Sequence, residues 1–330
     1  METKFIAETG VRTSRLAFGT MSFGAESDRE TSEALYRRAR EAGIFHFDTA
    51  DIYTKGAAEE ILGELIAAER DEIFLATKGY FPVGEGANQR GSSRYHLRNA
   101  VEASLRRLKT DRIDLYYLHR FDEKTALEES LRAIDDLIRA GKILYLGLSN
   151  FAAWQIQKSI GIAELRGLTK PVAIQPMYNL VKRAAEMELL PMAASERLAV
   201  FPYSPLGGGL LTGKYFSDDH EEDARLIRSA MYADRYGDED EQAGARRFIE
   251  FARERGHSPI ALAIAWVASH PAVTAPLLGA RNLAQLEVQL EALSIPMDAA
   301  LREELSALTK APPLATDRSD ELAPSSMDNR

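Results

Sequence analysis

The chain has 330 residues, of which 45% are hydrophobic and 28% are charged, a composition typical of an ordinary globular protein. A net charge of −9 argues against nucleic acid or an anionic membrane as the main partner. The absence of cysteine excludes disulfides and thiolate chemistry, and the apolar runs are too short to span a bilayer. Because residues 1–4 lead into a strand-like segment without an apolar leader, we expect a cytoplasmic protein.

The chain begins with a predicted β-hairpin, in which Lys4–Ala7 pairs with the segment from Val11 across the turn Glu8–Gly10. Strand-like and helical segments then alternate. The predicted strands are 15–20, 45–50, 72–78, 113–119, 143–150, 172–177, 198–205 and 273–279. The predicted helices are 28–42, 57–69, a segment through 97–108, a segment through 127–138, 152–166, 184–197, 240–255, 258–269 and one after Asn282.

Eight strand-then-helix units in one chain of this length favour an α/β fold with a single (β/α)₈ TIM barrel. The N-terminal hairpin and extra helices after the seventh strand would be additions to it. We expect the barrel to occupy residues 1–310 and the Pro-, Ser- and Asp-rich segment 311–330 to be a flexible C-terminal tail. An insertion at 214–237, which contains the acidic run Ser217–Asp223, is predicted to be a surface loop or else a flap over a cofactor.

Ionisable side chains stand where three consecutive predicted strands end. Asp48 and Tyr53 follow the second strand, Lys78 ends the third and His119 ends the fourth. Neighbouring strand ends of a barrel converge on one rim, so these four side chains should lie within reach of one another. Any one of them alone is better explained as a structural residue, but four at three consecutive strand ends favour an active site.

The chemistry of the four residues is complementary. A phenol has an unperturbed pKa of about 10, and we expect the Lys78 ammonium to lower the pKa of Tyr53 and suit it to proton transfer. The Asp48 carboxylate would keep Lys78 charged, and His119 would orient a carbonyl oxygen. His46 and Asp48 also alternate onto one strand face, but no further ligands complete a metal shell, so no metal site is predicted.

The later strands end in amides, hydroxyls and glycines instead. Ser149–Asn150 ends the fifth strand, Gln175 lies in the sixth, and Tyr203–Gly209 follows the seventh. The segment Gly279–Asn282 follows the eighth strand, and its Arg281 is suited to bind a phosphate. This half of the rim is therefore predicted to hold a nucleotide, with an aromatic ring beside it.

Taken together, these segments resemble the aldo-keto reductase family, in its bacterial and potassium-channel-β-like branch. The similarity extends from residue 5 to about residue 295 and follows the family's order. The matching segments are Gly19–Gly24, Phe47–Tyr53, Glu59–Gly63, Ala76–Lys78, Asp114–His119, Gly147–Phe151, Gln175–Asn179, Tyr203–Leu206 and Gly279–Leu286.

The resemblance implies a catalytic tetrad of Asp48, Tyr53, Lys78 and His119, with Tyr53 as general acid. It also implies that NADP(H), or NAD(H) as an alternative, is the cofactor. The residues implied to hold the nicotinamide carboxamide are Ser149, Asn150 and Gln175. Tyr203 is implied to stack on the nicotinamide ring. Residues implied to contact the pyrophosphate and adenosine ends are Ser204, Leu206, Gly208, Gly279, Arg281, Gln285 and Gln289.

The function implied is NADPH-dependent reduction of an aldehyde or ketone to an alcohol, with a small carbonyl compound or alcohol as the partner. Two other functions are weighed against it. One is a regulatory or redox-sensing protein that binds the cofactor but turns over little, similar to potassium-channel β subunits. The other is a metal-dependent hydrolase, which would need ligands that the sequence lacks. The loops at 79–94 and 208–237 carry no motif that selects a substrate.

Overall fold

The computed structural model describes residues 1–216 and 229–316. Two short strands, β1 (Thr3–Phe5) and β2 (Arg12–Ser14), pair antiparallel and form the predicted hairpin. Eight further strands are parallel, in the order β10-β3-β4-β5-β6-β7-β8-β9. Their bounds are β3 (Ala17–Gly19), β4 (His46–Asp48), β5 (Phe74–Gly79), β6 (Ile113–Leu118), β7 (Ile143–Ser149), β8 (Ala173–Gln175), β9 (Ala199–Val200) and β10 (Leu277–Leu278).

The sheet closes into a barrel through the segment that leads into β10. Leu277 pairs with β3, while the amide nitrogens of Thr274 and Leu277 donate to the carbonyl oxygens of Val200 and Pro202, both at 2.9 Å. Buried apolar and aromatic side chains fill the interior, including Ala17, Phe74, Ala76, Leu115, Tyr117 and Phe201. The predicted single (β/α)₈ barrel with an N-terminal hairpin is therefore confirmed.

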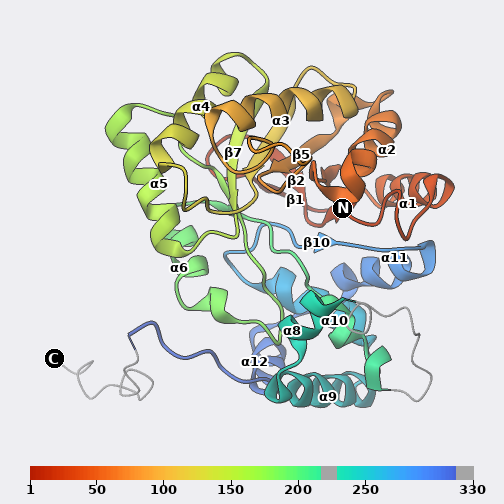
Figure 1. Cartoon of the computed structure of the whole chain (residues 1–330). Coiled ribbons are helices and arrows are strands. Elements are labelled where there is room, and N and C mark those ends of the chain that lie inside the picture. Colours follow the sequence, from red (N-terminus) through yellow and green to blue (C-terminus); the bar gives the residue numbers. More distant parts are fainter. Residues whose placement is uncertain (217–228, 317–330) are drawn as a thin grey trace.

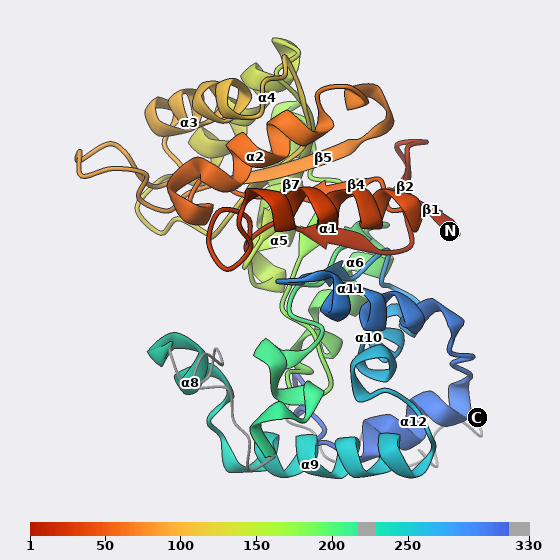
Figure 2. The same cartoon turned by 90° about the vertical axis from the view of Figure 1, so that its right-hand side faces the viewer.

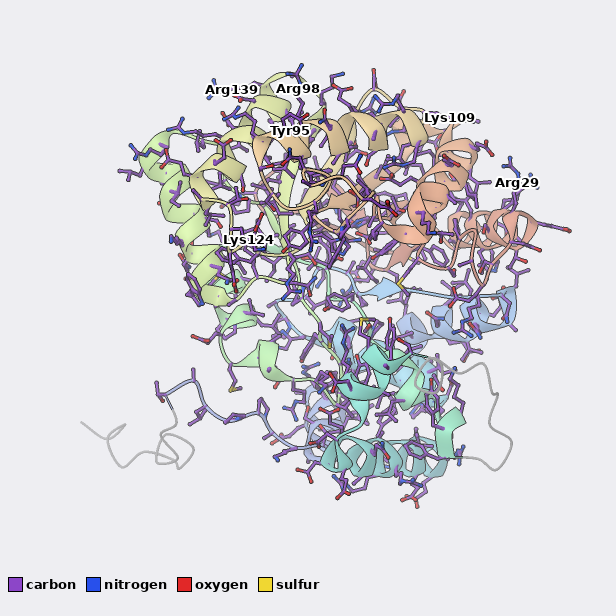
Figure 3. The ribbon with its side chains drawn as sticks, viewed as in Figure 1. Arg29, Tyr95, Arg98, Lys109, Lys124 and Arg139 are labelled. Carbon is purple, nitrogen blue, oxygen red and sulfur yellow. The ribbon has the colours of Figure 1, made fainter. Side chains whose placement is uncertain are left out.

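A helix follows each strand from β3 to β7 and covers the outside of the barrel (Figure 1). On the fourth of these helices, residues spaced three or four apart (Leu127, Leu131 and Ile134) are buried against the sheet. Charged side chains such as Arg98 and Arg139 point away from the barrel on the opposite faces (Figure 3). The bounds are α1 (Arg29–Glu41), α2 (Ala57–Ile66), α3 (Arg94–Arg107), α4 (Leu127–Arg139) and α5 (Ala153–Arg166).

The predicted extra helices follow β9. They are α9 (Glu239–Glu254) and α10 (Pro259–Ser269), and α11 (Leu283–Leu290) and α12 (Ala299–Ala307) come after β10. A further helix, α8 (Ala230–Tyr236), lies within the segment 214–237 that was predicted to be a loop or flap, so that prediction is wrong for residues 230–236. In both views α9, α10 and α12 lie together on the side of the molecule away from α3 and α4 (Figures 1 and 2). Helix α10 is buried over most of its surface, and Asp28, Ser258 and Asn282 cap their helices.

Several boundaries differ from the prediction. In place of one helix over 184–197, a 3₁₀ turn at Ala184–Glu186 precedes a short α6 (Leu189–Ser195). Proline has no N–H and fits only the first turn of a helix, so Pro191 forces α6 to begin just before it. The strands β9 and β10 are shorter than predicted. Helix α12 was not predicted, although Asp298 caps it by accepting a hydrogen bond from the Leu301 amide at 2.8 Å.

Two predictions fall on parts of the chain that are not described. The acidic run Ser217–Asp223 and most of the tail at 311–330 lie outside the described residues. Within residues 1–216 and 229–316, no helix is both long and apolar enough to cross a membrane.

Candidate active site

The structure brings Asp48, Lys78 and Tyr53 together at one rim of the barrel. Asp48 ends β4, and Lys78 lies beside it in the neighbouring strand β5. Lys78 is fully buried and donates hydrogen bonds to the Asp48 carboxylate and, at 2.8 Å, to the Thr49 carbonyl oxygen. Its Nζ also lies 3.5 Å from the Tyr53 hydroxyl. A buried, paired ammonium is therefore directed at the phenol.

The loop after β4 holds Tyr53 in a strained turn. Thr54 and Lys55, which follow it directly, have positive φ angles of 47° and 54°. The left-handed region is unfavourable for residues with a side chain and persists only where surrounding contacts impose it. One such contact is the hydrogen bond from the Thr54 hydroxyl to the Phe23 carbonyl oxygen at 3.0 Å. The turn thus fixes the position of Tyr53 relative to β4.

The pKa values in this group correct one prediction. Burial raises the pKa of Tyr53, and the opposing effect of the Lys78 ammonium is too small to bring it below its ordinary value. Burial would lower the pKa of Lys78, but the Asp48 carboxylate and the Tyr53 phenol outweigh burial and raise it. The prediction that Lys78 lowers the pKa of Tyr53 below 10 is therefore wrong for this state of the protein. The phenol keeps its proton, and the lysine keeps its charge.

His119 faces Tyr53 from the end of β6. The two rings are 6.1 Å apart between centroids in an edge-to-face arrangement, and the Phe81 ring lies 4.9 Å from His119 on another side. Burial, and then the Lys78 charge, lower the pKa of His119 well below its usual value. The imidazole is therefore neutral near pH 7, so it can donate or accept a hydrogen bond but is a poor acid. Its Nδ1 atom is buried and has no hydrogen-bond partner among residues 1–216 and 229–316.

The amide side chains predicted from β7 and β8 are joined to this group. Gln175 donates to Asp48 Oδ2 at 2.9 Å, and the Ser149 hydroxyl donates to the Gln175 carbonyl oxygen at 3.0 Å. Asn150 donates to the His119 carbonyl oxygen at 3.0 Å and accepts from the Tyr203 hydroxyl at 2.7 Å. One hydrogen-bonded network therefore spans both halves of the rim.

The segment after β9 contains several residues in the left-handed region. Ser204 has a φ of 55°, and the glycines that follow it continue in the left-handed region. At Gly208, with φ +63°, an added Cβ would come within 2.9 Å of the Tyr232 ring, so only glycine fits there. Backbone amides in such turns can accept anions. Here the Gly207 and Gly209 amides donate to the Ser204 and Leu206 carbonyl oxygens, both at 3.0 Å.

The residues after β10 form a second polar surface. Asn282 accepts from the Gln285 amide at 3.0 Å, and Gln285 in turn accepts from the Arg281 amide at 3.0 Å. Gln289 and Gly279 exchange hydrogen bonds at 2.9 and 3.3 Å. The Arg281 guanidinium lies 3.5 Å from Glu26, an acidic neighbour that the sequence did not reveal. Arg281 therefore stands at a helix N-terminus, where an anion is favoured.

A cavity of about 1140 Å³ connects these surfaces. Asp48, Tyr53 and His119 line it, whereas Lys78 lies directly behind them. All eleven residues predicted to contact a cofactor line it: Ser149, Asn150, Gln175, Tyr203, Ser204, Leu206, Gly208, Gly279, Arg281, Gln285 and Gln289. Several lining residues were not predicted, and they come from loops and from α8: Ile52, Phe81, Arg120, Lys214, Met231, Tyr232 and Arg235.

His46, considered as half of a metal pair, serves a structural role. It is fully buried between the Phe74 and Phe201 rings, and its Nδ1 lies 3.0 Å from the Thr13 hydroxyl. Burial, with a smaller contribution from Lys78, lowers its pKa to about 3. In the described ranges, no three His, Asp or Glu side chains lie where they could jointly hold a metal ion.

A second buried acidic group adjoins the tetrad, where the Asp51 amide donates to the Lys78 carbonyl oxygen at 3.1 Å. Asp51 is 3% exposed and Glu59 is fully buried. Glu59 accepts hydrogen bonds from the Thr77 hydroxyl at 2.6 Å and from the Arg107 guanidinium at 2.7 Å. Within the described part of the chain, neither Asp51 carboxyl oxygen has a hydrogen-bond partner. Burial and the nearby Glu59 carboxylate raise the pKa of Asp51 to about 8. Glu59 shares a helical stripe with Leu62 and Ile66, a pattern from which its burial could have been recognised.

The raised pKa of Asp51 predicts a specific pH dependence of stability. Native Asp51 keeps its proton to about pH 8, whereas an unfolded aspartate loses it near pH 4. The stabilising effect is complete below about pH 4 and is lost as the pH rises to about 8, at about 1.4 kcal/mol per pH unit. Between pH 5 and pH 7, the wild type should lose about 2.7 kcal/mol more unfolding free energy than Asp51→Asn. Urea titrations at both pH values test this, with the exposed Asp111→Asn as control. Equal losses in wild type and Asp51→Asn would refute it.

The barrel fold and the group of Asp48, Tyr53, Lys78 and His119 are those expected of the aldo-keto reductase family, and comparison with known proteins gives the same family. The sequence matches the model of the Aldo/keto reductase family over residues 15–310, so the chain belongs to this family of oxidoreductases. It is 37% identical over 323 residues to "Uncharacterized oxidoreductase YrpG" of Bacillus subtilis, covering 94% of this chain and 97% of that protein.

Two other relatives are assigned different roles. The chain is 35% identical to "Probable voltage-gated potassium channel subunit beta" of Oryza sativa, over 89% of this chain and 92% of that protein. It is 33% identical to "L-glyceraldehyde 3-phosphate reductase" of Escherichia coli, over 89% of this chain and 88% of that protein. The similar sequences thus include both a reductase and a probable channel subunit.

Proposed function

We propose that the protein reduces aldehydes or ketones to alcohols with NADPH, and that Tyr53 is the general acid. The observation that carries this proposal is the buried Lys78–Asp48 pair directed at the Tyr53 hydroxyl, with a neutral His119 beside it, at one wall of a cavity of about 1140 Å³. Such a group is suited to protonating a carbonyl oxygen while that oxygen gains negative charge.

The residues present fit a nicotinamide cofactor. The left-handed turn at Gly208 leaves room where a side chain would collide, and its backbone is suited to a pyrophosphate. Ser149, Asn150 and Gln175 would hold the carboxamide, and Tyr203 would cover the nicotinamide ring. When bound, the cofactor supplies a hydride to the carbonyl carbon.

Each member of the tetrad has a distinct role in this proposal. Tyr53, protonated because burial raises its pKa, donates its proton to the carbonyl oxygen. The Lys78 ammonium stabilises the phenolate that remains, and Asp48 holds the lysine charged and in place. Neutral His119 orients the oxygen through Nε2–H, an assignment that avoids leaving its buried Nδ1 as a donor without an acceptor. The proton returns to Tyr53 from solvent after the alcohol leaves.

A second candidate is a cofactor-binding regulatory protein with little turnover. The similarity to the potassium-channel β subunit of Oryza sativa favours it. One assay separates the two functions: NADPH oxidation followed at 340 nm with a panel of aldehydes and ketones, with and without chelator. Sustained, chelator-independent oxidation that depends on the carbonyl supports the reductase. Tight NADPH binding without turnover on any carbonyl would support the regulatory function instead.

Arg281 is expected to select NADPH over NADH. Its guanidinium lies beside the Asn282-capped start of α11, where a 2′-phosphate would receive a charge-assisted hydrogen bond. Loss of a contact worth roughly 1.5–3 kcal/mol predicts that Arg281→Ala binds NADPH about ten- to a hundredfold more weakly, with NADH nearly unchanged. Fluorescence titration with both cofactors measures this, and Arg98→Ala on the outer face of α3 is the control. Equal weakening of both cofactors would contradict the assignment.

A further inference from the structure

Among the described residues that line the cavity, basic side chains outnumber acidic ones, although the whole chain has a net charge of −9. Among the described residues that line it, Asp48 is the single acidic side chain, and Lys78 neutralises it. Four cationic side chains line the same cavity, Arg120, Lys214, Arg235 and Arg281, and of these Arg281 has the Glu26 carboxylate 3.5 Å from its guanidinium. A recess with this imbalance attracts and concentrates anions.

The proposed cofactor accounts for two of these four charges. Arg281 stands at the start of α11, and the Lys214 side chain lies over Gly209, where an added Cβ would be 3.0 Å from Lys214 Cε. Both residues therefore belong to the surfaces proposed to hold the phosphates. Arg120 is placed differently, because it follows His119 directly at the end of β6, next to the proposed carbonyl site.

Arg120 has no acidic partner within the described ranges. The acidic residue nearest to Arg120 in the sequence is Asp122. Its carboxylate accepts hydrogen bonds from the Ser92 amide at 2.8 Å and from the Thr125 hydroxyl at 2.7 Å. An unpaired guanidinium at the wall of a cavity retains its full capacity for a carboxylate or a phosphate.

Arg235 reaches the cavity from α8, and no carboxylate in residues 1–216 or 229–316 pairs with it. Its guanidinium carbon lies 5.5 Å from the centre of the Tyr232 ring, which also lines the cavity. The helix is anchored by Tyr236, which is fully buried and hydrogen-bonded to Asn179 at 3.3 Å. Because Tyr236 holds α8 in place, the helix fixes the position of the Arg235 backbone at the cavity.

The cavity also has apolar lining residues. Ile52, Phe81 and Met231 line it, and the Phe81 ring contacts the His119 ring edge to face at 4.9 Å between centroids. We infer that the preferred substrates are short carbonyl compounds that carry an anionic group, a carboxylate or a phosphate, which Arg120 and Arg235 bind while the carbonyl faces Tyr53 and His119. This inference rests on the proposed reductase function and names its substrate class.

Matched substrates test it directly. Succinic semialdehyde is compared with butanal, and glycolaldehyde phosphate with glycolaldehyde, by kcat/KM in NADPH oxidation. The wild type should prefer at least one anionic member by about tenfold or more. Arg120→Gln and Arg235→Gln should each lower kcat/KM for that substrate by about ten- to a hundredfold and leave the neutral member unchanged. Arg98→Gln, on the outer face of α3, is the matched control and should change neither (Figure 3).

A binding measurement makes the result independent of turnover. Calorimetry should show that the NADP⁺-loaded protein binds 4-hydroxybutyrate, the alcohol product of succinic semialdehyde, more tightly than 1-butanol. Both arginine variants should remove that difference in affinity. Equal kcat/KM for charged and neutral substrates, or equal binding of the two alcohols, would overturn the inference. If Arg235→Gln weakens NADPH itself and slows both members alike, Arg235 belongs to the cofactor site and the inference is wrong. Failure of every carbonyl to be reduced would reject the proposed function, while the calorimetric comparison still decides this inference.

Discussion

Tyr53→Phe should abolish carbonyl reduction while leaving cofactor binding nearly unchanged. The substitution removes the hydroxyl that lies 3.5 Å from Lys78 Nζ and keeps the ring that faces His119. Loss of one positioned acid typically costs about 10²–10⁴-fold in rate. NADPH oxidation at saturating carbonyl measures the loss, and fluorescence titration measures the affinity for NADPH.

The control for this experiment is Tyr95→Phe. Tyr95 is a tyrosine on α3 that is 67% exposed and lies outside the cavity (Figure 3). It should keep wild-type turnover. Near-wild-type turnover in Tyr53→Phe would show that another group supplies the proton.

Lys78→Met should destabilise the fold as well as inactivate the protein. Lys78 is fully buried and Asp48 is 2% exposed, so removing the lysine leaves a buried carboxylate without its counter-charge. Breaking a buried ion pair in this way typically costs about 3–5 kcal/mol of unfolding free energy. Denaturant titration followed by tryptophan fluorescence measures this cost.

The double variant Asp48→Asn with Lys78→Met separates the two effects. It removes both charges, so it should recover most of the lost stability and stay inactive. Lys124→Met, at an exposed lysine, is the control for loss of a lysine as such (Figure 3). A single variant Lys78→Met with wild-type stability would contradict the account of Lys78 and Asp48 as a buried ion pair.

The sequence predicted the barrel and the convergence of Asp48, Lys78 and His119, because both follow from regular alternation. Apolar strands followed by amphipathic helices repeat with little interruption, and parallel strands of a barrel place their carboxyl ends on one rim. Helix caps were equally readable, since the Ser258 and Asn282 side chains interact within one turn of their own helices. Local patterns thus set the positions of the strand-end residues.

Contacts between distant segments were not readable in this way. The side chains of Phe81, Tyr232 and Arg235 reach the cavity from segments without hydrophobic periodicity, so nothing in the sequence places them beside Tyr53. The direction of the Tyr53 pKa shift was predicted wrongly because the shift depends on the balance between burial and the Lys78 charge. That balance is set by the packing of the whole rim, which the spacing of residues does not reveal.

Transfer of a labelled hydride tests the proposed activity most directly. The protein is supplied with NADPH that carries deuterium at the reactive C4 position of the nicotinamide, together with an aldehyde, and the alcohol is analysed by mass spectrometry. We predict one deuterium on the former carbonyl carbon with the wild type and Tyr95→Phe, and a loss of about 10²–10⁴-fold in labelled product with Tyr53→Phe. Saturating NADPH binding with no labelled alcohol from any aldehyde would contradict the proposed function.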